Sequence, residues 1–369
     1  MPQFPEIENL MKIESLRLID IRNQADFSLV PDEELTVLTG PNGCGKTNLL
    51  EAIYFASVGK SFRTSVNEDL IAFDKEEGTI FIDFSLRGIR HQLKVRLSSY
   101  ESVQFFINET KIRRKDIIGT FRTVLFTPDE LRLIKGAPQD RRRFLDLEVS
   151  QVSPRYYEEI LIYQRAVKQR NAALREAQIR GKKPDIDMWD MQIAKGAAYI
   201  VKKRKETLAK MNELVKKTVF SLTGGQEDIQ IEYRQAGSDG QIHSDMEWYL
   251  EKLALYREDD RKFCHTSIGP HRDDLRFLFQ GRDMLHFASQ GQQRSAVLAV
   301  KLAEIQFIFS ETGEYPILLL DDIGSELDEE RQEALFSKLK ENQVQTLVTT
   351  TKKTRPGGKE IRIDREVTV

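Results

Sequence analysis

The sequence predicts an α/β fold in which the two ends of the chain build one α/β lobe and a mostly helical lobe is inserted between them. Three observations lead to this prediction. A glycine-rich segment at residues 40–47 lies between an expected strand and an expected helix. An apolar strand of the fully buried type, at 317–320, ends in two consecutive aspartates. Between these sites, residues 153–222 have the spacing of two long helices.

Hydrophobic periodicity gives the elements of the N-terminal part, which is rich in short strands. The expected elements are strands at 12–21, 28–30, 34–38, 79–85, 92–97 and 102–107 and a helix at 46–57. In the middle of the chain, Ser153 followed by Pro154 favours a helix start, because serine caps the first turn and proline fits its first position.

The long helices and the C-terminal elements complete the prediction. The first long helix reaches about residue 180, and the second runs from 187 to 222 and stops at a Gly-Gly pair. The C-terminal part alternates between a helix at 293–310, a strand at 317–320, a helix at 328–341 and a strand at 345–349. This alternation is typical of an α/β sheet with parallel strands.

Composition excludes several classes of protein. The 369 residues carry a net charge of −2, so nucleic acid would have to bind to a local basic patch. The two cysteines, Cys44 and Cys264, form no CxxC pair, which argues against a zinc module and fits a reducing cytoplasm. No apolar run has membrane-spanning length, and no membrane partner is expected. Residues 1–10 are expected to be an N-terminal extension without signal-peptide character.

The glycine-rich segment matches GxxxxGK[ST], and its position between strand and helix is the context that this motif requires. Backbone N–H groups of such a loop, and of the helix that follows, point toward phosphate oxygens. Lys46 supplies a positive charge to the β- and γ-phosphates, and Thr47 offers a hydroxyl to Mg²⁺. The residues expected to bind ATP are Gly40, Pro41, Asn42, Gly43, Cys44, Gly45, Lys46, Thr47 and Asn48.

A second, acidic site follows the strand at 317–320. Ligands bind at the carboxyl ends of strands in open α/β sheets, so Asp321 and Asp322 are expected near the phosphate loop. Asp321 is expected to hold Mg²⁺ together with Thr47. Asp322 and Lys46 are the expected catalytic residues, with Asp322 orienting or deprotonating the attacking water.

Further motifs resemble the RecF family of ABC-type ATPases. Ser289, Gln290, Gly291 and Gln292 resemble the ABC signature, and the segment 325–328, ending in Asp328, resembles the D-loop. More specific matches, in the expected order, lie at 51–54, 59–63, 127–130, 141–146, 168–174 and 269–275. Only about 240 residues separate the phosphate loop from the signature, so the resemblance implies an ABC-type head without a long coiled coil.

The resemblance implies how the protein works. Two copies would form an ATP-dependent homodimer in which Ser289 and Gly291 of one copy contact the γ-phosphate bound by the other. Arg22 and Asn23 would lie near the base, and Arg63 would reach the nucleotide or DNA. Threonines at 349–351 stand where ABC proteins usually have a switch histidine, which predicts slow turnover.

Lysine and arginine outnumber the acidic residues about two to one between residues 153 and 217, and the densest run is Lys202, Lys203, Arg204 and Lys205. Such a patch would contact DNA phosphates without sequence preference, although most charge runs are solvated helix faces. The resemblance implies binding to double-stranded and gapped DNA, with RecR, RecO and RecA as partners.

The predicted domains are an ATPase lobe of residues 11–122 and 265–369 and a helical lobe of residues 123–264. The leading functional hypothesis is an ATP-dependent, DNA-binding recombination mediator with a weak, DNA-stimulated ATPase. Three alternatives remain open at this point: an ABC ATPase subunit of a transporter, a metabolic P-loop kinase, and a nucleotide-gated clamp with negligible hydrolysis.

Overall fold

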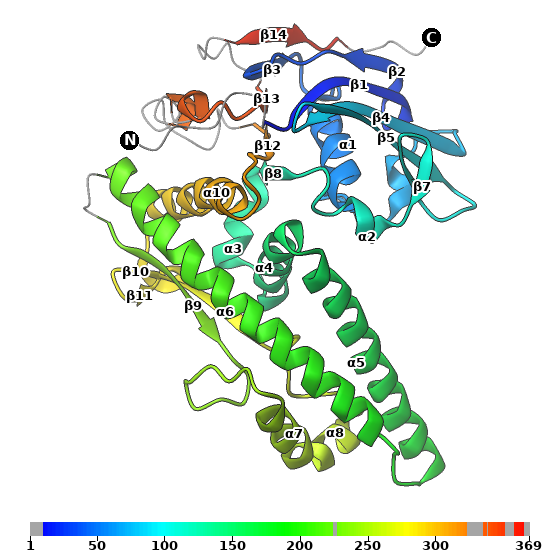
Figure 1. Cartoon of the computed structure of the whole chain (residues 1–369), viewed down its shortest axis with the longest axis vertical. Helices are drawn as coiled ribbons and strands as arrows, with labels where there is room; N and C mark the ends of the chain where they lie inside the picture. Colours follow the sequence, from blue (N-terminus) through cyan, green and yellow to red (C-terminus); the bar gives the residue numbers. More distant parts are fainter. Residues whose placement is uncertain (1–9, 224–226, 323–334, 338, 351–357, 365–369) are drawn as a thin grey trace. The chain divides into compact units, whose positions relative to one another are not determined.

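The computed structural model describes residues 10–223, 227–322, 335–337, 339–350 and 358–364 (Figure 1). The chain divides into two compact units. Unit 1 comprises residues 1–130 and 301–369, and unit 2 comprises residues 131–300. None of the helices in the described ranges combines the length and the apolar character that crossing a bilayer requires.

An antiparallel sheet of unit 1 has the strand order β2-β1-β4-β5-β6-β7. Its strands alternate buried and exposed side chains, as expected when one face of a sheet is covered and the other is solvated. The strands are β1 (Lys12–Ile21), β2 (Gln24–Leu29), β4 (Glu77–Leu86), β5 (Ile89–Ser98), β6 (Gln104–Ile107) and β7 (Thr110–Ile112). The short helices η2 (Asn67–Leu70) and α2 (Arg114–Ile117) belong to the same part of the chain.

A parallel sheet of unit 1 has the strand order β14-β3-β13-β12-β8. Its members are β3 (Leu35–Thr39), β8 (Thr123–Phe126), β12 (Ile317–Leu320), β13 (Thr346–Thr349) and β14 (Lys359–Arg362). The helix α1 (Lys46–Val58) is buried along most of its length, and it contacts strands of both sheets. The carboxyl ends of β3, β13 and β12 therefore lie next to one another at one edge of the parallel sheet.

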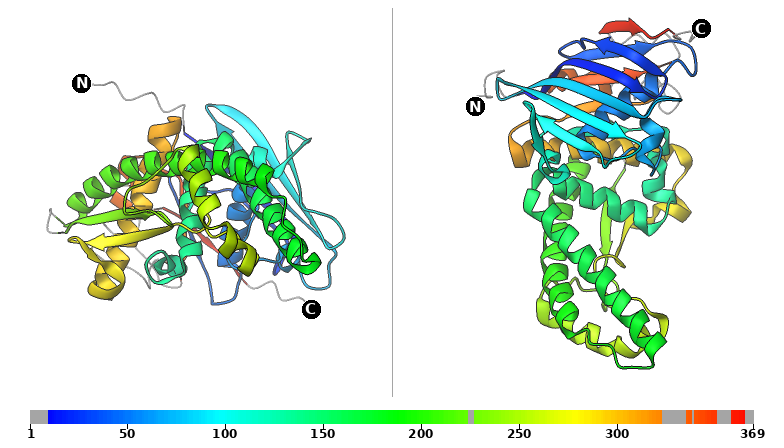
Figure 2. Two further views of the ribbon diagram at one scale, coloured as in Figure 1. Left: turned by 90° about the horizontal axis from the view of Figure 1, so that it is seen from below. Right: turned by 90° about the vertical axis from the view of Figure 1, so that its right-hand side faces the viewer.

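Unit 2 is built around two long helices that run side by side, α5 (Pro154–Arg180) and α6 (Asp187–Thr223) (Figure 2). It also contains a small antiparallel sheet of β9 (Ile229–Arg234), β10 (Asp274–Phe279) and β11 (Arg282–Asp283). Its other helices are α3 (Arg132–Lys135), α4 (Pro138–Val152), α7 (Met246–Leu255), α8 (Arg257–Phe263) and α9 (Met284–Phe287). The turn η3 (Pro128–Leu131) leads into unit 2, and α10 (Gln290–Thr312) leads from unit 2 into unit 1.

The α/β class and the inserted helical region predicted from the sequence are confirmed, but the boundaries differ. The chain enters unit 2 after residue 130 rather than 122 and leaves it after residue 300 rather than 264. The second difference has a clear cause, because β10 pairs with β9 and so holds residues after 264 in unit 2. The strands β7, β8, β9, β11 and β14 were not predicted. The expected helix at 328–341 falls largely outside the described residues.

Candidate nucleotide-binding site

The loop between β3 and α1 has the backbone shape of a phosphate-binding loop. Gly40, Gly43 and Gly45 all have positive φ angles, which glycine adopts without steric cost. The φ of Gly45 is +109°, which L side chains rarely adopt, and a Cβ atom there would also lie 2.4 Å from the side-chain nitrogen of Gln24 and 2.7 Å from the side-chain oxygen of Asn23. The 13-residue helix α1 begins directly at Lys46 and directs its free N–H groups toward the loop.

Lys46 is nearly buried and points back over its own loop. Its ammonium group donates hydrogen bonds to the carbonyl oxygens of Gly40 and Pro41 at 2.8 and 3.0 Å. These two carbonyl oxygens keep the Lys46 ammonium group at the loop. Phosphate oxygens, which carry full negative charge, would be stronger acceptors for it than the carbonyls.

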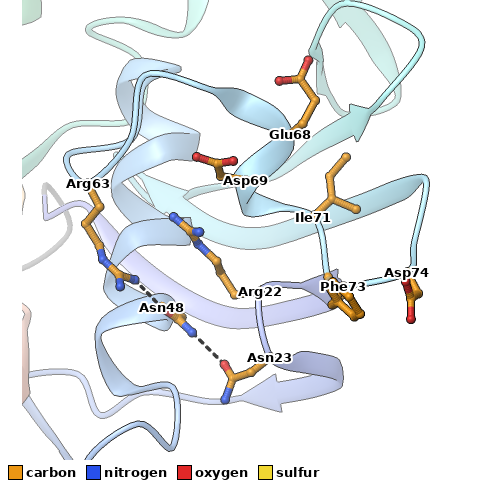
Figure 3. A pocket seen from close by; sticks show the side chains of 10 residues that line it. Arg22, Asn23, Asn48, Arg63, Glu68, Asp69, Ile71, Phe73 and Asp74 are labelled. Carbon is orange, nitrogen blue, oxygen red and sulfur yellow. Dashed lines mark hydrogen bonds between the residues drawn. The ribbon is translucent and has the colours of Figure 1, made fainter.

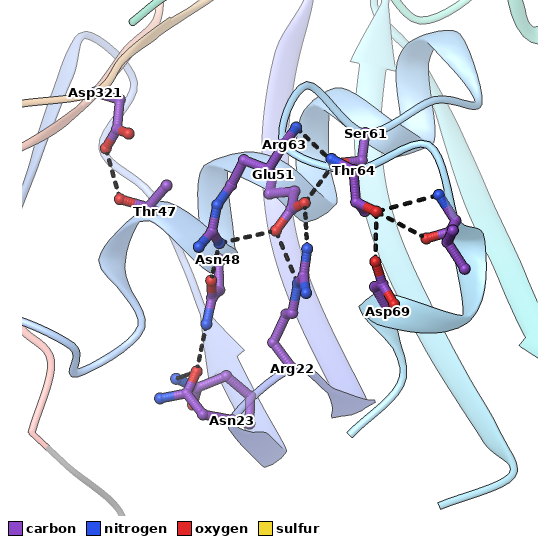
Figure 4. A network of polar contacts seen from close by, with 12 residues as sticks. Arg22, Asn23, Thr47, Asn48, Glu51, Ser61, Arg63, Thr64, Asp69 and Asp321 are labelled. Atoms are coloured by element: carbon purple, nitrogen blue, oxygen red, sulfur yellow. Dashed lines mark hydrogen bonds and ion pairs between the residues drawn. The ribbon is translucent and has the colours of Figure 1, made fainter. Parts of the chain in front are cut away.

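Thr47 and the acidic pair meet at the carboxyl edge of the parallel sheet. The Thr47 hydroxyl donates to Oδ1 of Asp321 at 2.9 Å (Figure 4), and the buried Thr349 hydroxyl donates to the same oxygen at 2.6 Å. Thr349 also accepts the backbone N–H of Asp322 at 2.9 Å. Thr349 therefore fixes both aspartates, a role that the sequence did not reveal.

The chemistry of this donor set fits Mg²⁺. This cation prefers oxygen ligands, and it is usually held by one or two protein groups together with substrate phosphates. The Thr47 hydroxyl and the Asp321 carboxylate are such groups, and they lie beside the phosphate loop. Within the described ranges, no cluster of three or more His, Cys, Asp or Glu side chains could hold a metal by itself.

A buried carboxylate on α1 organises the other side of the loop. Glu51 is 1% exposed and receives two hydrogen bonds from the Arg22 guanidinium, at 2.7 and 3.0 Å. It also accepts a hydrogen bond from Ser61 and one from Arg63, the latter at 3.1 Å (Figure 4). Sequence reasoning noted Glu51 only as part of a family motif and missed its role in positioning both arginines.

Two asparagines connect this cluster to the phosphate loop. Asn23 donates to the carbonyl oxygen of Cys44 at 3.0 Å, and Asn48 donates to Asn23 at 2.7 Å. Arg63 in turn donates to Asn48 at 2.6 Å. Arg22 and Asn23, predicted together at the end of the first strand, and Arg63, from the separate motif at 59–63, thus form one network with the start of α1. All three line the open pocket shown in Figure 3.

The signature segment lies in unit 2, where it begins α10. Ser289 accepts the backbone N–H of Gln292 at 3.2 Å, and the Gln292 side chain accepts the backbone N–H of Ser289 at 2.8 Å. This reciprocal capping leaves the Ser289 hydroxyl hydrogen available for a ligand. Ser289, Gln290 and Gly291 are exposed. The predicted D-loop residue Asp328 lies outside the described residues.

The predicted DNA-binding run on α6 divides into exposed and buried members. Lys202 and Lys205 are exposed, and Lys203 pairs with Glu206 at 2.7 Å. The prediction for Arg204 is wrong, because its guanidinium is only 3% exposed and pairs with Asp146. Its remaining hydrogen bonds go to three oxygen acceptors, which belong to Tyr156, Tyr233 and Pro270.

The segment 269–275 enters the same buried network of unit 2. Asp273 accepts hydrogen bonds from the Tyr233 hydroxyl and from the Ala236 N–H, and burial raises its pKa to about 6. His271 contacts the Tyr163 hydroxyl and the Thr266 carbonyl, and burial lowers its pKa to about 4. This motif therefore contributes to the core of unit 2.

The parallel sheet, the phosphate loop, the acidic pair and the capped signature helix together define an ATPase head of the ABC type. The RecF/RecN/SMC N terminal domain family matches residues 12–357. A DNA replication and repair protein RecF from Bacillus subtilis is 39% identical over 351 residues, covering 92% of this chain and 93% of that protein. The RecF of Alkaliphilus oremlandii is 37% identical over 345 residues, with the same coverage. The chain belongs to the RecF family.

Solved structures agree with this assignment. A structure described as that of "the recombination mediator protein RecF-ATP in RecFOR pathway" has 31% identity and a TM-score of 0.90, covering 96% of each chain. An Smc head domain from Pyrococcus furiosus, at 15% identity and a TM-score of 0.53, shares the fold. Family membership excludes the alternative of a transporter subunit.

Proposed function

We propose that this DNA replication and repair protein is an ATP-dependent recombination mediator that dimerises on double-stranded DNA near single-strand gaps. The observation that carries the proposal is the cluster of Thr47, Asp321 and Thr349 beside the phosphate loop. It supports binding of a nucleoside triphosphate and in-line attack of water on its γ-phosphate. The solved RecF-ATP structure, similar over 96% of the chain, supports ATP as the nucleotide.

Each site residue has a physical role in this scheme. Lys46 would exchange the carbonyls of Gly40 and Pro41 for β- and γ-phosphate oxygens, which carry full negative charge. Asp322 would orient the attacking water and accept its proton. Thr47 and Asp321 would hold Mg²⁺, which supplies charge neutralisation on the phosphates when bound.

Slow hydrolysis follows from the residue at the end of β13. Thr349 uses its hydroxyl to bind both aspartates, so that hydroxyl is engaged in the site rather than directed at a phosphate. In other ABC proteins, a switch histidine at this place contacts the γ-phosphate. Thr349 would not make that contact. ATP would therefore persist long enough to hold an assembly together.

The dimer would use the exposed start of α10. A helix N-terminus favours negative charge, and Ser289 retains a hydroxyl hydrogen for a phosphate oxygen. Ser289, Gln290 and Gly291 of one copy would thus cap the nucleotide held by the loop of a second copy. Asp328 would contribute from the D-loop of the same interface.

The DNA and protein partners rest on family membership. Solved RecF structures are described as belonging to the RecFOR pathway, which supports RecR and RecO as partners, and loading of RecA at gaps is the corresponding activity. Lys202 and Lys205 are the exposed members of the predicted run on α6, and they are its candidates for contacts with DNA phosphates.

Duplex DNA binding across a salt series, with and without ATP, tests this function. Wild type should bind more tightly with ATP, and Lys46→Ala should lose that difference. The matched control Lys195→Ala, an exposed lysine on α6, should keep it. Equal DNA affinity with and without ATP would contradict the proposal. Phosphate release to water, measured alongside, distinguishes a slow ATPase from a clamp with negligible hydrolysis and from a kinase.

A further inference from the structure

A chain of polar contacts inside unit 2 leads from α6 toward the signature segment. It begins at Arg204, which lies on α6 between the exposed Lys202 and Lys205. The Arg204 guanidinium donates to the carbonyl oxygen of Pro270 at 2.8 Å and to the Tyr233 hydroxyl at 3.1 Å. Strand β9, which carries Tyr233, also packs against α6 (Figure 1). The helix with the candidate DNA contacts is therefore joined both to β9 and to the segment before β10.

The Tyr233 hydroxyl stands at the middle of this chain of contacts. It accepts from Arg204 and donates to the carboxylate of Asp273, the residue directly before β10. Asp273 is 1% exposed, and its second carboxylate oxygen accepts the Ala236 N–H at 2.9 Å. Arg142, on α4, donates to the Asp273 carbonyl oxygen at 2.7 Å. The start of β10 is thus held from α4, α6 and β9 together, because a buried carboxylate is stable only with its donors in place.

Strand β10 connects this fixed point to the signature. Within the hairpin that β10 forms with β11, Arg276 pairs with Asp283 at 2.6 Å, and Asp283 also caps the start of α9. Gln293, 3% exposed on α10, donates to carbonyl oxygens at the two ends of α9, at 3.0 and 3.3 Å. Ser289 follows directly after α9 and its final cap. Each link between α6 and Ser289 is therefore a hydrogen bond, an ion pair or a strand pairing within unit 2.

We infer that Tyr233 is a positioning residue that couples DNA bound along α6 to the placement of Ser289. The inference rests on the proposed function, in which Lys202 and Lys205 contact DNA phosphates and Ser289 caps a nucleotide held by a second copy. DNA on the two lysines would restrain α6, and the contact between Tyr233 and Asp273 would pass this restraint through β10 to the start of α10. By thermodynamic linkage, ATP would then raise the affinity for DNA by the same factor as DNA raises the affinity for ATP.

Duplex DNA binding with and without ATP, at fixed Mg²⁺ and salt, measures this coupling as the ratio of the two affinities. Tyr233→Phe keeps the ring but removes the hydroxyl between Arg204 and Asp273, so the ratio should fall about five-fold, the size expected for one buried hydrogen bond. DNA affinity without ATP, and ATP affinity without DNA, should equal those of wild type, because the lysines of α6 and the phosphate loop are untouched. A merely structural role would leave the ratio unchanged.

Tyr249→Phe is the matched control. It removes the hydroxyl of another buried tyrosine of unit 2, which accepts a hydrogen bond from Gln235 at 2.7 Å and lies outside this chain of contacts. Its affinity ratio should equal that of wild type. Arg276→Gln breaks the chain nearer the signature, at a side chain that is 39% exposed, and should lower the ratio as well. This second variant decides the case if circular dichroism shows that Tyr233→Phe does not fold.

An unchanged affinity ratio in either folded variant would overturn the inference. So would an equal fall of the ratio in Tyr249→Phe, because it would show a general effect of losing a buried hydroxyl. Failure of the proposed function gives a different result, since wild type itself would then bind DNA equally with and without ATP.

Discussion

The Thr47 hydroxyl donates to a carboxylate oxygen of Asp321 over 2.9 Å, although 274 positions separate the two residues. The parallel sheet explains this proximity. β13 pairs with β3 on one side and with β12 on the other, so the loops after β3 and β12 emerge at the same edge. Thr349, at the end of β13, lies between them and binds Asp321 as well.

Asp321→Asn and Asp322→Asn should therefore differ in their effects. Loss of the Asp321 charge should raise the Mg²⁺ concentration that phosphate release requires, because Asp321 is the expected metal ligand. Asp322→Asn should lower the maximal rate of phosphate release by about 100-fold, a typical loss for a general base, at an unchanged Mg²⁺ requirement. Steady-state phosphate release over a Mg²⁺ titration measures both. Identical Mg²⁺ profiles for the two variants would contradict the assignment.

Glu51→Gln should lower the free energy of unfolding by about 2 kcal/mol, because it weakens charged hydrogen bonds to Arg22 and Arg63 around a buried carboxylate. Urea denaturation followed by circular dichroism measures this. The control Glu77→Gln weakens a similar pair with Arg96, in which both partners are exposed, and its loss of stability should be clearly smaller. An equal loss of unfolding free energy in the two variants would contradict the prediction, because it would show that burial does not strengthen the ion pairs of Glu51.

His271 and Asp273 should give unit 2 opposing pH dependences. The His271 pKa falls from 6.5 to about 4 on folding, so the unfolded state binds its proton more readily and stability rises with pH across that window. The Asp273 pKa rises from 3.8 to about 6, so the folded state binds its proton more readily and stability falls as pH rises through that window. The two contributions nearly cancel in wild type.

Replacing either His271 or Asp273 should leave the pH dependence of the other group visible in the stability of unit 2. Relative to wild type, the free energy of unfolding of His271→Asn should fall as pH rises from 4 to 6, and that of Asp273→Asn should rise, each by at most about 1.4 kcal/mol per pH unit. Both tryptophans, Trp189 and Trp248, lie in unit 2, so their fluorescence in urea reports this unit. If the unfolding free energy of the variants changed with pH in parallel with that of wild type, the pKa shifts of His271 and Asp273 would be refuted.

The lysines and the arginine of the 202–205 run should behave differently. Replacing Lys202 and Lys205 with alanine should weaken duplex binding and reduce the slope of log affinity against log salt by about 2. Arg204→Ala should instead lower the free energy of unfolding by about 3 kcal/mol, because it leaves the Asp146 carboxylate without its partner. The control pair Lys75→Ala and Lys359→Ala should leave the salt slope unchanged. An unchanged slope in the first pair would remove these lysines as DNA contacts.

Local patterns in the sequence predicted the parts of the fold that depend on local chemistry. The phosphate loop, the apolar strand before Asp321 and the long helices each follow from spacing within a short segment. The meeting of Thr47 and Asp321 followed from a general rule for parallel strands. The Glu51 cluster could not be predicted in this way, because its partners Arg22, Ser61 and Arg63 come from two other segments and neither segment forms a motif with Glu51.

Arg204 shows the limit of reading charge from sequence. Its neighbours Lys202 and Lys205 are three residues apart and share the exposed face of α6. Arg204 lies on the opposite face of the helix, which packs inside unit 2. The buried acceptors come from residues 146, 156, 233 and 270, which lie far apart in the chain. Helical periodicity suggests which face is inward, but only the fold reveals a partner for a buried charge. The boundary at residue 300 was missed for a similar reason. β9 alternates apolar and polar residues as a strand should, but its pairing with β10, which holds residues after 264 in unit 2, joins segments about 40 residues apart.

Sedimentation velocity with and without ATP tests most directly whether a triphosphate held by one copy is capped by another. Wild type should sediment as a dimer only with ATP, and Lys46→Ala should remain a monomer. Ser289→Arg should still bind ATP by titration but stay monomeric, whereas Ser99→Arg, which changes another exposed serine, in unit 1, should dimerise normally. An ATP-dependent dimer of Ser289→Arg as stable as that of wild type would contradict the account.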